Sequence, residues 1–281
     1  MSSRVFRDDL YAGKVAIVTG GGTGIGAATA RELGKLGATV VIASRKAENV
    51  DPAVKGLTEE LGRPVFGATC DIRDRVAVRT FIADVVARHG RVDLLVNNGG
   101  GQFFAPAETI SDKGFDAVVA TNLAGTWNMT RAVADAWMLA HGGSIVNVTM
   151  LTSRAFPGMA HSVAARAGVE AMSRTLAVEW AARNVRVNCI APGLVLSSGF
   201  SRYPAGLEMI ATMRTTVPMK RFASCEEIAW WIAFVGSEAG AYVTGQTLTV
   251  DGGKTLWGDW WPIADPAEWP KIELPKEPWE T

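Results

Sequence analysis

The pattern of apolar and polar positions divides the chain into alternating strands and helices. Short unbroken runs of Val, Ile and Leu are typical of strands buried on both faces of a parallel sheet. We expect seven such strands, at residues 15–19, 39–43, 65–69, 92–96, 144–148, 185–190 and 248–250. Between them apolar residues recur with helical spacing. This spacing predicts helices at about 24–36, 50–61, 75–88, 113–140, 158–182 and 225–236.

This order of elements predicts an α/β fold. We expect a doubly wound parallel sheet of the Rossmann type, with about seven strands and helices on both faces. Ligands bind where the carboxyl ends of the strands meet. The chain shows no internal repeat and no flexible linker, so residues 1–281 are expected to form a single domain.

Two segments depart from the alternation. Residues 194–221 interrupt the last crossover with several Gly and Pro residues, and we expect a substrate lid there. Residues 254–281 form an aromatic tail that holds five of the ten tryptophans. These rings are costly to leave in water, so the tail is expected to pack as a surface brace or to line a pocket.

Composition and charge narrow the kind of protein. Hydrophobic residues make up 48% of the 281 residues and the net charge is zero. This suits a large buried core and gives no electrostatic reason for nucleic acid or an anionic membrane as a partner. The three cysteines and three histidines lack metal-site spacing, so no metal is expected. With neither a signal peptide nor a membrane span in the sequence, the cytoplasm is the expected location.

A glycine-rich turn, Thr19-Gly-Gly-Gly-Thr-Gly-Ile-Gly26, follows the first strand and opens a helix. Its glycines allow a tight turn, close approach of a diphosphate and packing of the helix against the strand. The N–H groups at the helix start then bind phosphate oxygens. The turn therefore predicts a dinucleotide site made by Gly20, Thr23, Gly24, Ile25 and Gly26.

The residues after the second strand discriminate between dinucleotides. A carboxylate there would favour NAD, but this chain has Ser44, Arg45 and Lys46. Because Arg and Lys can hold the 2′-phosphate, we expect NADPH. After the third strand, Asp71 and Ile72 are expected beside the adenine.

The loop after the fourth strand is also rich in glycine. Asn98, Gly99 and Gly100 let the backbone approach the adenine ribose, so we expect them at the cofactor too.

Together these residues resemble the short-chain dehydrogenase/reductase family over essentially the whole chain. The matching motifs are the glycine turn, Asn97-Asn-Gly-Gly100, Asn122 within Thr-Asn-Leu-Ala-Gly, and Asn188-Cys-Ile-Ala-Pro-Gly193. The resemblance implies that Asn122 shapes the active site and that Pro192, Gly193 and Val195 pass along the nicotinamide. It also implies a homotetramer or a dimer.

The resemblance places a catalytic serine near Thr149 and a Tyr-x-x-x-Lys pair on the following helix. Here Ser162 stands in the tyrosine position and Arg166 in the lysine position. Reduction of a ketone produces an alkoxide that needs a nearby acid such as a phenol. A serine hydroxyl is a far weaker acid. Reduction of a C=C bond conjugated to a thioester produces an enolate instead, which hydrogen-bond donors stabilise.

Further stretches look like the trans-2-enoyl-CoA and 2,4-dienoyl-CoA reductases of peroxisomes, among them Ile42-Ala-Ser-Arg-Lys46, Asn97-Asn-Gly-Gly-Gly-Gln-Phe103 and Ser162-Val-Ala-Ala-Arg-Ala-Gly168. We therefore expect NADPH-dependent reduction of a 2-enoyl-CoA or 2,4-dienoyl-CoA. Asn122, Thr149 and Ser162 would surround the thioester oxygen, and Arg166 would position the nicotinamide ribose. No tyrosine matches the one those relatives use, so the proton donor stays open.

Other interpretations remain at this point. Arg202, Arg214, Lys220 or Arg221 would meet the phosphates of an acyl-CoA, or would form an ordinary basic surface. The protein would instead be a carbonyl or alcohol oxidoreductase for a 3-ketoacyl-CoA, terpenoid or steroid if Tyr203 supplied the acid. A weakly catalytic NADPH-binding sensor or scaffold is a third possibility.

Overall fold

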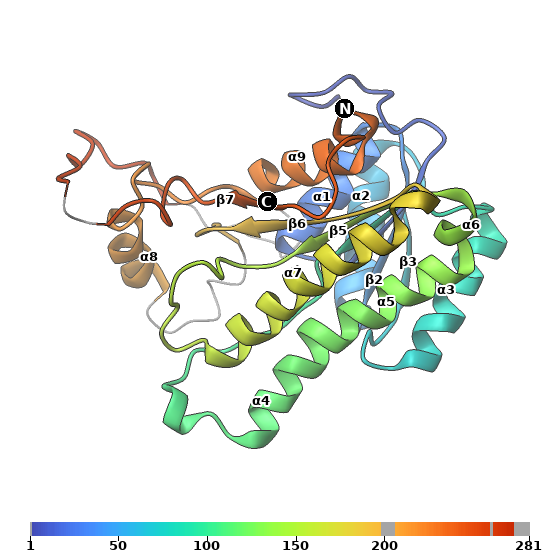
Figure 1. Ribbon diagram of the computed structural model, residues 1–281. Coiled ribbons are helices and arrows are strands. Elements are labelled where there is room, and N and C mark those ends of the chain that lie inside the picture. Colours follow the sequence, from blue (N-terminus) through green and yellow to red (C-terminus); the bar gives the residue numbers. More distant parts are fainter. Residues whose placement is uncertain (1, 198–205, 259–260, 273–281) are drawn as a thin grey trace.

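The centre of the protein is a seven-stranded parallel sheet in a computed structural model that describes residues 2–197, 206–258 and 261–272 (Figure 1). The strands lie in the order β3-β2-β1-β4-β5-β6-β7. They are β1 (Val15–Thr19), β2 (Thr39–Ser44), β3 (Phe66–Thr69), β4 (Leu94–Asn97), β5 (Gly143–Val148), β6 (Val185–Pro192) and β7 (Thr247–Val250). The predicted doubly wound Rossmann sheet is confirmed, because the order reverses between β1 and β4.

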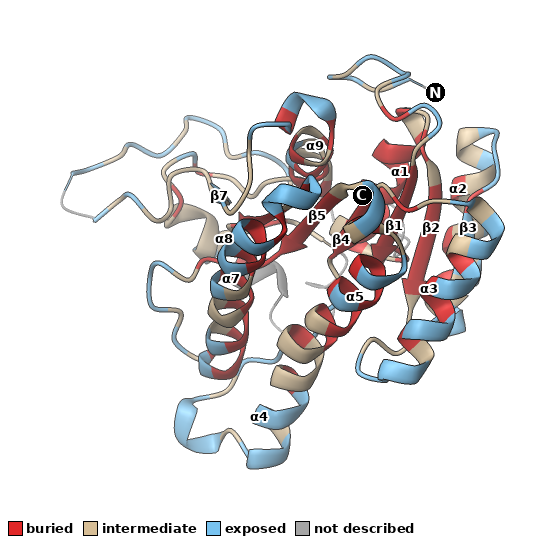
Figure 2. Ribbon diagram, turned by 45° about the vertical axis from the view of Figure 1, so that its right-hand side comes forward, coloured by how far each residue is buried: buried red, intermediate tan, exposed pale blue. Residues whose placement is uncertain are grey.

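Helices cover both faces of this sheet. They are α1 (Gly24–Lys35), α2 (Ala47–Leu61), α3 (Arg75–His89), α4 (Asp112–Val119), α5 (Gly125–Val133), α6 (Leu139–His141), α7 (Ala160–Trp180), α8 (Gly206–Thr215) and α9 (Cys225–Gly236). α1, α2 and α9 pack on one face, and α3, α5 and α7 pack on the other. Neighbouring residues of β1 serve both layers, because Val18 faces the first group and Ile17 the second. Figure 2 shows the buried residues gathered on the strands and on the inner sides of these helices.

The helical run between β4 and β5 is not the uniform helix that the spacing predicts. It extends from α4 to α6, but two π-helical segments interrupt it, at Ala120–Ala124 and Ala134–Met138. A π-helical segment adds a residue to one turn and is frequent at functional sites. The first of these segments holds Asn122, which is completely buried.

The segment 194–221 contains a helix that the sequence pattern did not predict. α8 lies within it, and the described part of the C-terminal tail packs against this region. The Arg214 guanidinium stacks 4.2 Å from the centre of the Trp269 ring and donates a hydrogen bond to the Pro270 carbonyl at 3.1 Å. Lys220 pairs with Asp265 at 3.1 Å. The described part of the tail is thus held against the segment 194–221.

The part of the chain that the structure describes contains no helix with the length and apolarity of a membrane span. Within the same residues, no three His, Cys, Asp or Glu side chains gather in the manner of a metal site. Cys70, Cys189 and Cys225 are all free and buried.

Candidate functional site

The glycine turn lies at the carboxyl end of β1 and is shaped by close packing. A Cβ atom on Gly20 would lie 2.9 Å from Asn98 Nδ2, and one on Gly26 would lie 2.2 Å from the Gly20 carbonyl oxygen. Gly20 and Gly24 also have positive φ angles of 64° and 52°. Side chains are therefore excluded where the backbone must be open to a diphosphate.

The start of α1 is suited to an anion. Thr23 occupies the N-cap position, but its side chain makes no capping hydrogen bond, and the first turn has no acidic residue. The N–H groups of this turn consequently keep their capacity to bind phosphate oxygens. Ile25, in the same turn, lines the neighbouring cavity. The turn thus fits the dinucleotide that its sequence implies.

A threonine that the sequence analysis did not select joins this turn to the loop after β4. Thr19 Oγ1 accepts hydrogen bonds from the backbone N–H groups of Asn98 at 3.1 Å and Gly99 at 2.9 Å. The Asn98 amide in turn donates to the carbonyls of Thr19 at 3.1 Å and Gly20 at 3.3 Å. The two loops at the centre of the sheet edge are therefore held in one fixed arrangement.

The two basic residues after β2, Arg45 and Lys46, differ in their contacts. Lys46 occupies the N-cap position of α2 and forms an exposed ion pair with Glu48 at 2.7 Å. Arg45 is exposed and has no ion-pair partner among the described residues. Ser44 is half-buried at the end of the strand. Arg45 is thus the cation of this pair that can bind a 2′-phosphate without breaking an existing contact.

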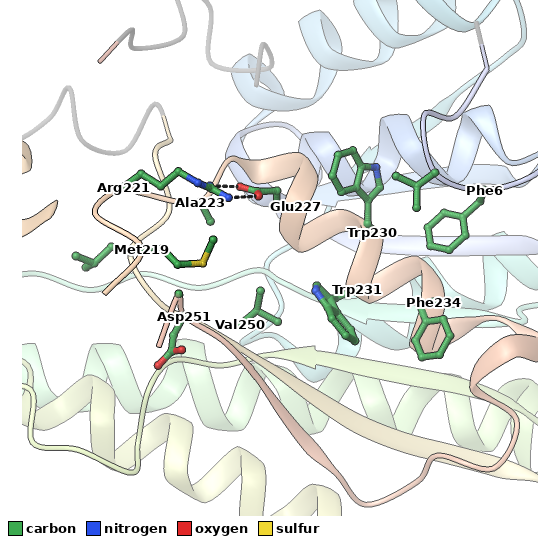
Figure 3. Close-up of a pocket in the computed structure, with 13 residues that line it drawn as sticks. Phe6, Met219, Arg221, Ala223, Glu227, Trp230, Trp231, Phe234, Val250 and Asp251 are labelled. Atoms are coloured by element: carbon green, nitrogen blue, oxygen red, sulfur yellow. Dashed lines mark hydrogen bonds and ion pairs between the residues drawn. The ribbon is translucent and has the colours of Figure 1, made fainter. Parts of the chain in front are cut away.

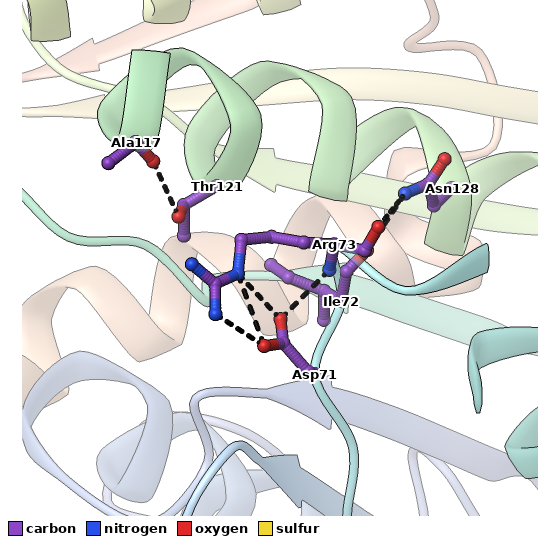
Figure 4. A network of polar contacts seen from close by, with 6 residues as sticks. All are labelled: Asp71, Ile72, Arg73, Ala117, Thr121 and Asn128. Carbon is purple, nitrogen blue, oxygen red and sulfur yellow. Dashed lines mark hydrogen bonds and ion pairs between the residues drawn. The ribbon is translucent and has the colours of Figure 1, made fainter. Parts of the chain in front are cut away.

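Asp71 after β3 is held as a carboxylate by Arg73 (Figure 4). The Arg73 Nε donates to Asp71 Oδ1 at 2.9 Å and its backbone N–H to the same oxygen at 3.0 Å. This hydrogen bonding, together with the charge of Arg73, keeps the pKa of Asp71 below its usual value. Next to it, the Ile72 carbonyl accepts a hydrogen bond from Asn128 at 2.9 Å, which ties the loop to α5.

A cavity of about 520 Å³ opens at the same sheet edge, beyond the glycine turn. Several predicted site residues line it: Ile25, Asn98, Gly100, Thr149, Arg166, Pro192, Gly193 and Val195. Its remaining walls are largely apolar, and include Phe103, Phe104, Leu151 and Phe156. A few polar groups in a mainly apolar cavity are typical of a small-molecule site.

Arg166 is almost fully buried in the wall of this cavity. Its Nη1 donates to the Val148 carbonyl at 2.7 Å. A Cβ atom on Gly100 would lie only 2.2 Å from Arg166 Nη2 and 2.8 Å from Asn122 Oδ1, so a larger residue here would displace these two side chains. Burial lowers the pKa of Arg166 to about 10, which leaves the guanidinium charged at neutral pH.

Asn122 and Ser162 lie one layer behind the cavity surface. Asn122 Oδ1 accepts a hydrogen bond from the Gly101 N–H, and Asn122 Nδ2 donates one to the Gly101 carbonyl, both at 3.0 Å. Ser162 is completely buried and donates to Gln102 Oε1 at 2.8 Å. Of the three residues expected around a thioester oxygen, only Thr149 lines the cavity itself.

Gln102 is a polar cavity residue that was not among the predicted site residues. It is exposed in the cavity wall, and its oxygen is turned toward Ser162. Since Ser162 fixes the oxygen of the amide, the NH₂ group is the end available to a ligand. Its place at the end of the glycine run after β4 was the signal that could have identified it.

Glu170 is a second functional candidate that the sequence did not single out. It lies on α7, one turn beyond Arg166, and is 8% exposed. Thr149 Oγ1 donates to its Oε1 at 3.1 Å, and Thr152 Oγ1 donates to its Oε2 at 2.7 Å. A buried carboxyl group therefore lies directly behind a hydroxyl of the cavity wall.

No tyrosine lines the cavity within the described residues. Tyr11 is buried beneath α9 and donates to the Ala233 carbonyl at 2.8 Å. Burial raises its pKa far above the ordinary value. Tyr242 is fully exposed to solvent. Tyr203, considered above as an acid from the lid, lies outside the described residues.

The basic residues considered for coenzyme A phosphates are engaged in contacts within the protein. Arg214 and Lys220 contact the tail as described above, and Arg221 forms a bidentate ion pair with Glu227, with both distances 2.7 Å. Arg202 lies outside the described residues. A phosphate that bound to Arg214, Lys220 or Arg221 would compete with these contacts.

A second cavity, of about 460 Å³, is lined by aromatic side chains of α9 and by the Arg221–Glu227 pair (Figure 3). It lies behind the wall of the first cavity. Val195 and Ala223 form a parallel bridge there, and the Ala223 N–H donates to the Leu194 carbonyl at 2.9 Å. Leu194 lines both cavities, but no residue of the glycine turn or of α7 lines the second one.

Comparisons with known proteins agree with this geometry. A family model described as "Enoyl-(Acyl carrier protein) reductase" matches residues 20–255. A peroxisomal 2,4-dienoyl-CoA reductase of Danio rerio is 36% identical over 256 residues, which cover 90% of this chain and 85% of that protein. The 3-oxoacyl-[acyl-carrier-protein] reductase FabG of Thermotoga maritima is 37% identical over 245 residues, or 87% of this chain and 98% of that protein.

Solved structures show the same relationship. A citronellol catabolism dehydrogenase (AtuB) of Pseudomonas aeruginosa aligns with a TM-score of 0.80 and 42% sequence identity, covering 89% of this chain and 98% of the other. The aligned residues include the glycine turn, the loops after β2 to β4 and most of the cavity beside them. The chain belongs to the short-chain dehydrogenase/reductase family of oxidoreductases, which bind nicotinamide cofactors.

Proposed function

We propose that the protein uses NADPH to reduce the C=C bond of a 2-enoyl-CoA or 2,4-dienoyl-CoA thioester. One observation carries this proposal: the family's tyrosine position is occupied by Ser162, which is buried and hydrogen-bonded to Gln102. The described part of the cavity thus has amide and hydroxyl groups but no phenol to protonate an alkoxide. The dienoyl-CoA reductase among the relatives and the description of the family model support the same chemistry.

Bound NADPH would supply the hydride, which adds to the β-carbon of a 2-enoyl-CoA or to the δ-carbon of a 2,4-dienoyl-CoA that is converted to the 3-enoyl product. The residues of the chain would stabilise the negative charge that then develops on the thioester oxygen. The Gln102 NH₂ group is the best placed neutral donor, because Ser162 fixes the orientation of the amide. Arg166 would hydrogen-bond to the nicotinamide ribose, and Phe103 and Phe104 would contact the acyl chain.

The choice of NADPH rests on Arg45. Its exposed side chain follows β2, where the adenine ribose would lie, and is free of ion pairs among the described residues. We place the enzyme in the cytoplasm, as a homotetramer or dimer. Size-exclusion chromatography with light scattering tests the assembly, and cell fractionation tests the location.

The direct test is a spectrophotometric assay of NADPH oxidation. Crotonyl-CoA, longer trans-2-enoyl-CoA thioesters and a 2,4-dienoyl-CoA are offered to the purified protein. The proposal predicts turnover of at least one chain length, with the saturated or 3-enoyl product identified by mass spectrometry. No turnover with any chain length contradicts it.

Carbonyl or alcohol oxidation–reduction is the second candidate, and a specific contact favours it. Thr149 directs its hydroxyl hydrogen toward Glu170 or the Ile190 carbonyl, so its oxygen offers a lone pair to a ligand hydroxyl. FabG and the citronellol dehydrogenase are relatives with names of this class. A panel of 3-ketoacyl, terpenoid and steroid substrates separates the two candidates. Tight NADPH binding without any reduction would indicate a sensor or scaffold.

A further inference from the structure

Glu170 is a buried carboxyl group that the proposed function has not yet used. It shares one face of α7 with Ser162 and Arg166, at successive four-residue intervals. Burial of an ionisable group is costly unless hydrogen bonds compensate for it. Glu170 lies behind the cavity wall and accepts a hydrogen bond from Thr149, which lines the cavity. The hydrogen bonds that compensate for its burial therefore involve a residue of the candidate site.

The hydrogen-bond partners of Glu170 are two threonine hydroxyls. Thr149 Oγ1 contacts Oε1 at 3.1 Å and Thr152 Oγ1 contacts Oε2 at 2.7 Å. Among the residues that the structure describes, no Lys, Arg or His forms an ion pair with it. A hydroxyl both donates and accepts, so the carboxyl group is hydrogen-bonded with or without its proton.

The proton on Glu170 determines what Thr149 can do for a ligand. Thr149 has one hydroxyl hydrogen, and both of its partners, Glu170 Oε1 and the Ile190 carbonyl at 3.3 Å, are acceptors when the carboxyl is ionised. In that state Thr149 offers only a lone pair to the cavity. When Glu170 carries a proton, it can donate to Thr149 Oγ1, and the Thr149 hydrogen is then divided only between the longer contact with the Ile190 carbonyl and a substrate atom.

We propose that Glu170 is a positioning residue that delivers, through the Thr149 hydroxyl, the proton that completes the reduction. This inference rests on the proposed function. After hydride has reached the β-carbon, the enolate takes the Thr149 hydrogen at its α-carbon, while the Glu170 proton moves to Thr149 Oγ1. The thioester carbonyl is restored, Thr149 keeps its hydroxyl, and Glu170 is left as a carboxylate.

Thr152 connects Glu170 to the route by which a new proton would reach it. It is half-buried, whereas Thr149 is 7% exposed and faces the cavity. The chain Thr152–Glu170–Thr149 therefore crosses the wall from a solvent-accessible end to the cavity. A proton from water that enters through the Thr152 hydroxyl would recharge Glu170 after each turnover.

Within the described part of the chain, the other titratable or charged groups near Glu170 lie on α7 and β6. On α7 these are Arg166, which is bonded to the Val148 carbonyl, and the exposed Arg174. On β6 the neighbour is Cys189, whose thiol pKa is raised to about 11, chiefly by burial and to a smaller extent by Glu170. Cys189 is a neutral thiol at neutral pH and does not compete as the proton source.

The first test uses isosteric variants in the enoyl-CoA assay. Glu170→Gln keeps the shape of the side chain but cannot supply the proton, and kcat is expected to fall about 100-fold with KM changed less than about twofold. Thr149→Val is expected to show a similar loss, and Thr149→Ser to recover most of the activity. Glu179→Gln, an exposed carboxylate on the same helix, is the matched control and retains full activity.

Isotope effects distinguish proton delivery from a structural role. In Glu170→Gln the proton step becomes slow, so the solvent deuterium effect on kcat rises and the effect of 4-deuterated NADPH falls toward one. A misplaced nicotinamide would instead preserve or increase the effect of the deuterated cofactor. That result, or a variant with wild-type kcat, overturns the inference.

A binding experiment gives a readout without turnover. Acetoacetyl-CoA is mostly un-ionised at neutral pH and releases about one proton when it binds as its enolate, whereas protonation of Glu170 takes about one proton up. Titration calorimetry in buffers of different ionisation enthalpy should therefore show almost no net proton release by wild-type protein. Glu170→Gln should release about one proton, and equal release by both proteins contradicts the relay.

Failure of the relay and failure of the proposed function are distinguishable. If wild-type protein reduces ketones but no enoyl-CoA, the proposed function is wrong, and the same variants are assayed on the ketone, whose alkoxide needs the same proton. Loss of kcat in Glu170→Gln would then still support the relay. A wild type that reduces neither class overturns both.

Discussion

Ser162 donates its hydroxyl hydrogen to the oxygen of Gln102 over 2.8 Å and thereby fixes which end of that amide faces the cavity. Ser162, in the tyrosine position of the family, thus acts by orienting Gln102. A phenol at this position would transfer a proton, whereas the Gln102 amide can only donate a hydrogen bond. This exchange suits the stabilisation of an enolate better than the quenching of an alkoxide.

Gln102→Leu tests this relationship. Removal of a hydrogen-bond donor at a developing oxyanion is expected to lower kcat/KM for the enoyl-CoA about 100-fold. Ser162→Ala leaves the amide in place without its orienting partner, so a loss of about tenfold is expected. Gln246→Leu, an exposed amide at the start of β7, is the control and retains activity. A larger loss in Ser162→Ala than in Gln102→Leu would show that Ser162 contacts the substrate itself.

Arg45→Ala tests the cofactor preference. Loss of a charge-assisted hydrogen bond to the 2′-phosphate is expected to lower kcat/KM for NADPH about 10- to 100-fold, with little change for NADH. Lys55→Ala, which removes an exposed cation from α2, is the control and leaves both values unchanged. Steady-state kinetics with both cofactors provides the measurement. Wild-type protein with equal kcat/KM for the two cofactors would refute the preference.

The Asp71–Arg73 pair predicts a pH dependence of stability. Because Arg73 lowers the pKa of Asp71 in the folded state, the pair stabilises the protein above about pH 4, and this contribution disappears as the pH falls through the lowered value. The pair is partly exposed, so its contribution is about 0.5–1 kcal/mol. Asp71→Asn should therefore lower Tm by about 1–2 °C at pH 7 and by less at pH 3. A difference that grows on acidification contradicts the assignment.

Trp269→Ala tests the contact between the tail and α8. Without the ring beneath Arg214, the contact between the tail and α8 is weakened, and α8 should become more sensitive to limited proteolysis. KM for the acyl substrate should rise several-fold while the affinity for NADPH stays constant, because the contacts of Trp269 and Asp265 are with Arg214 and Lys220 and not with the glycine turn. Trp137→Ala, which removes a partly buried indole stacked on His141, serves as the control for loss of an indole. An unchanged KM would restrict the tail to a structural role.

The sheet and the cofactor loops could be predicted because their signals are local. Buried parallel strands have continuous apolar runs, and the glycine turn is contiguous in sequence, so β1 and Gly20 to Gly26 were found directly. α8 was missed because glycines and prolines around it masked a short helix with little periodicity. The π-helical segments have no pattern of their own, since they arise from backbone hydrogen bonds.

The polar wall of the site depends on contacts between distant segments. Ser162 and Gln102 are 60 residues apart, and the serine's burial follows from how the loop after β4 folds over the start of α7. Glu170 was hidden for the same reason: nothing in its own sequence context shows that Thr149 and Thr152 lie above it. The four-residue spacing from Ser162 to Arg166 to Glu170 was the one available clue.

The π-helical segment Ala120–Ala124 makes the number of residues between α4 and α5 structurally important. Asn122 reaches Gly101 from the widened turn, while Asn128, further along the same run, reaches the loop after β3. Deletion of one residue between them would rotate everything downstream by about 100° relative to everything upstream. The two amides would then no longer meet their targets together, so evolution can exchange side chains in this helix far more easily than it can add or remove a residue.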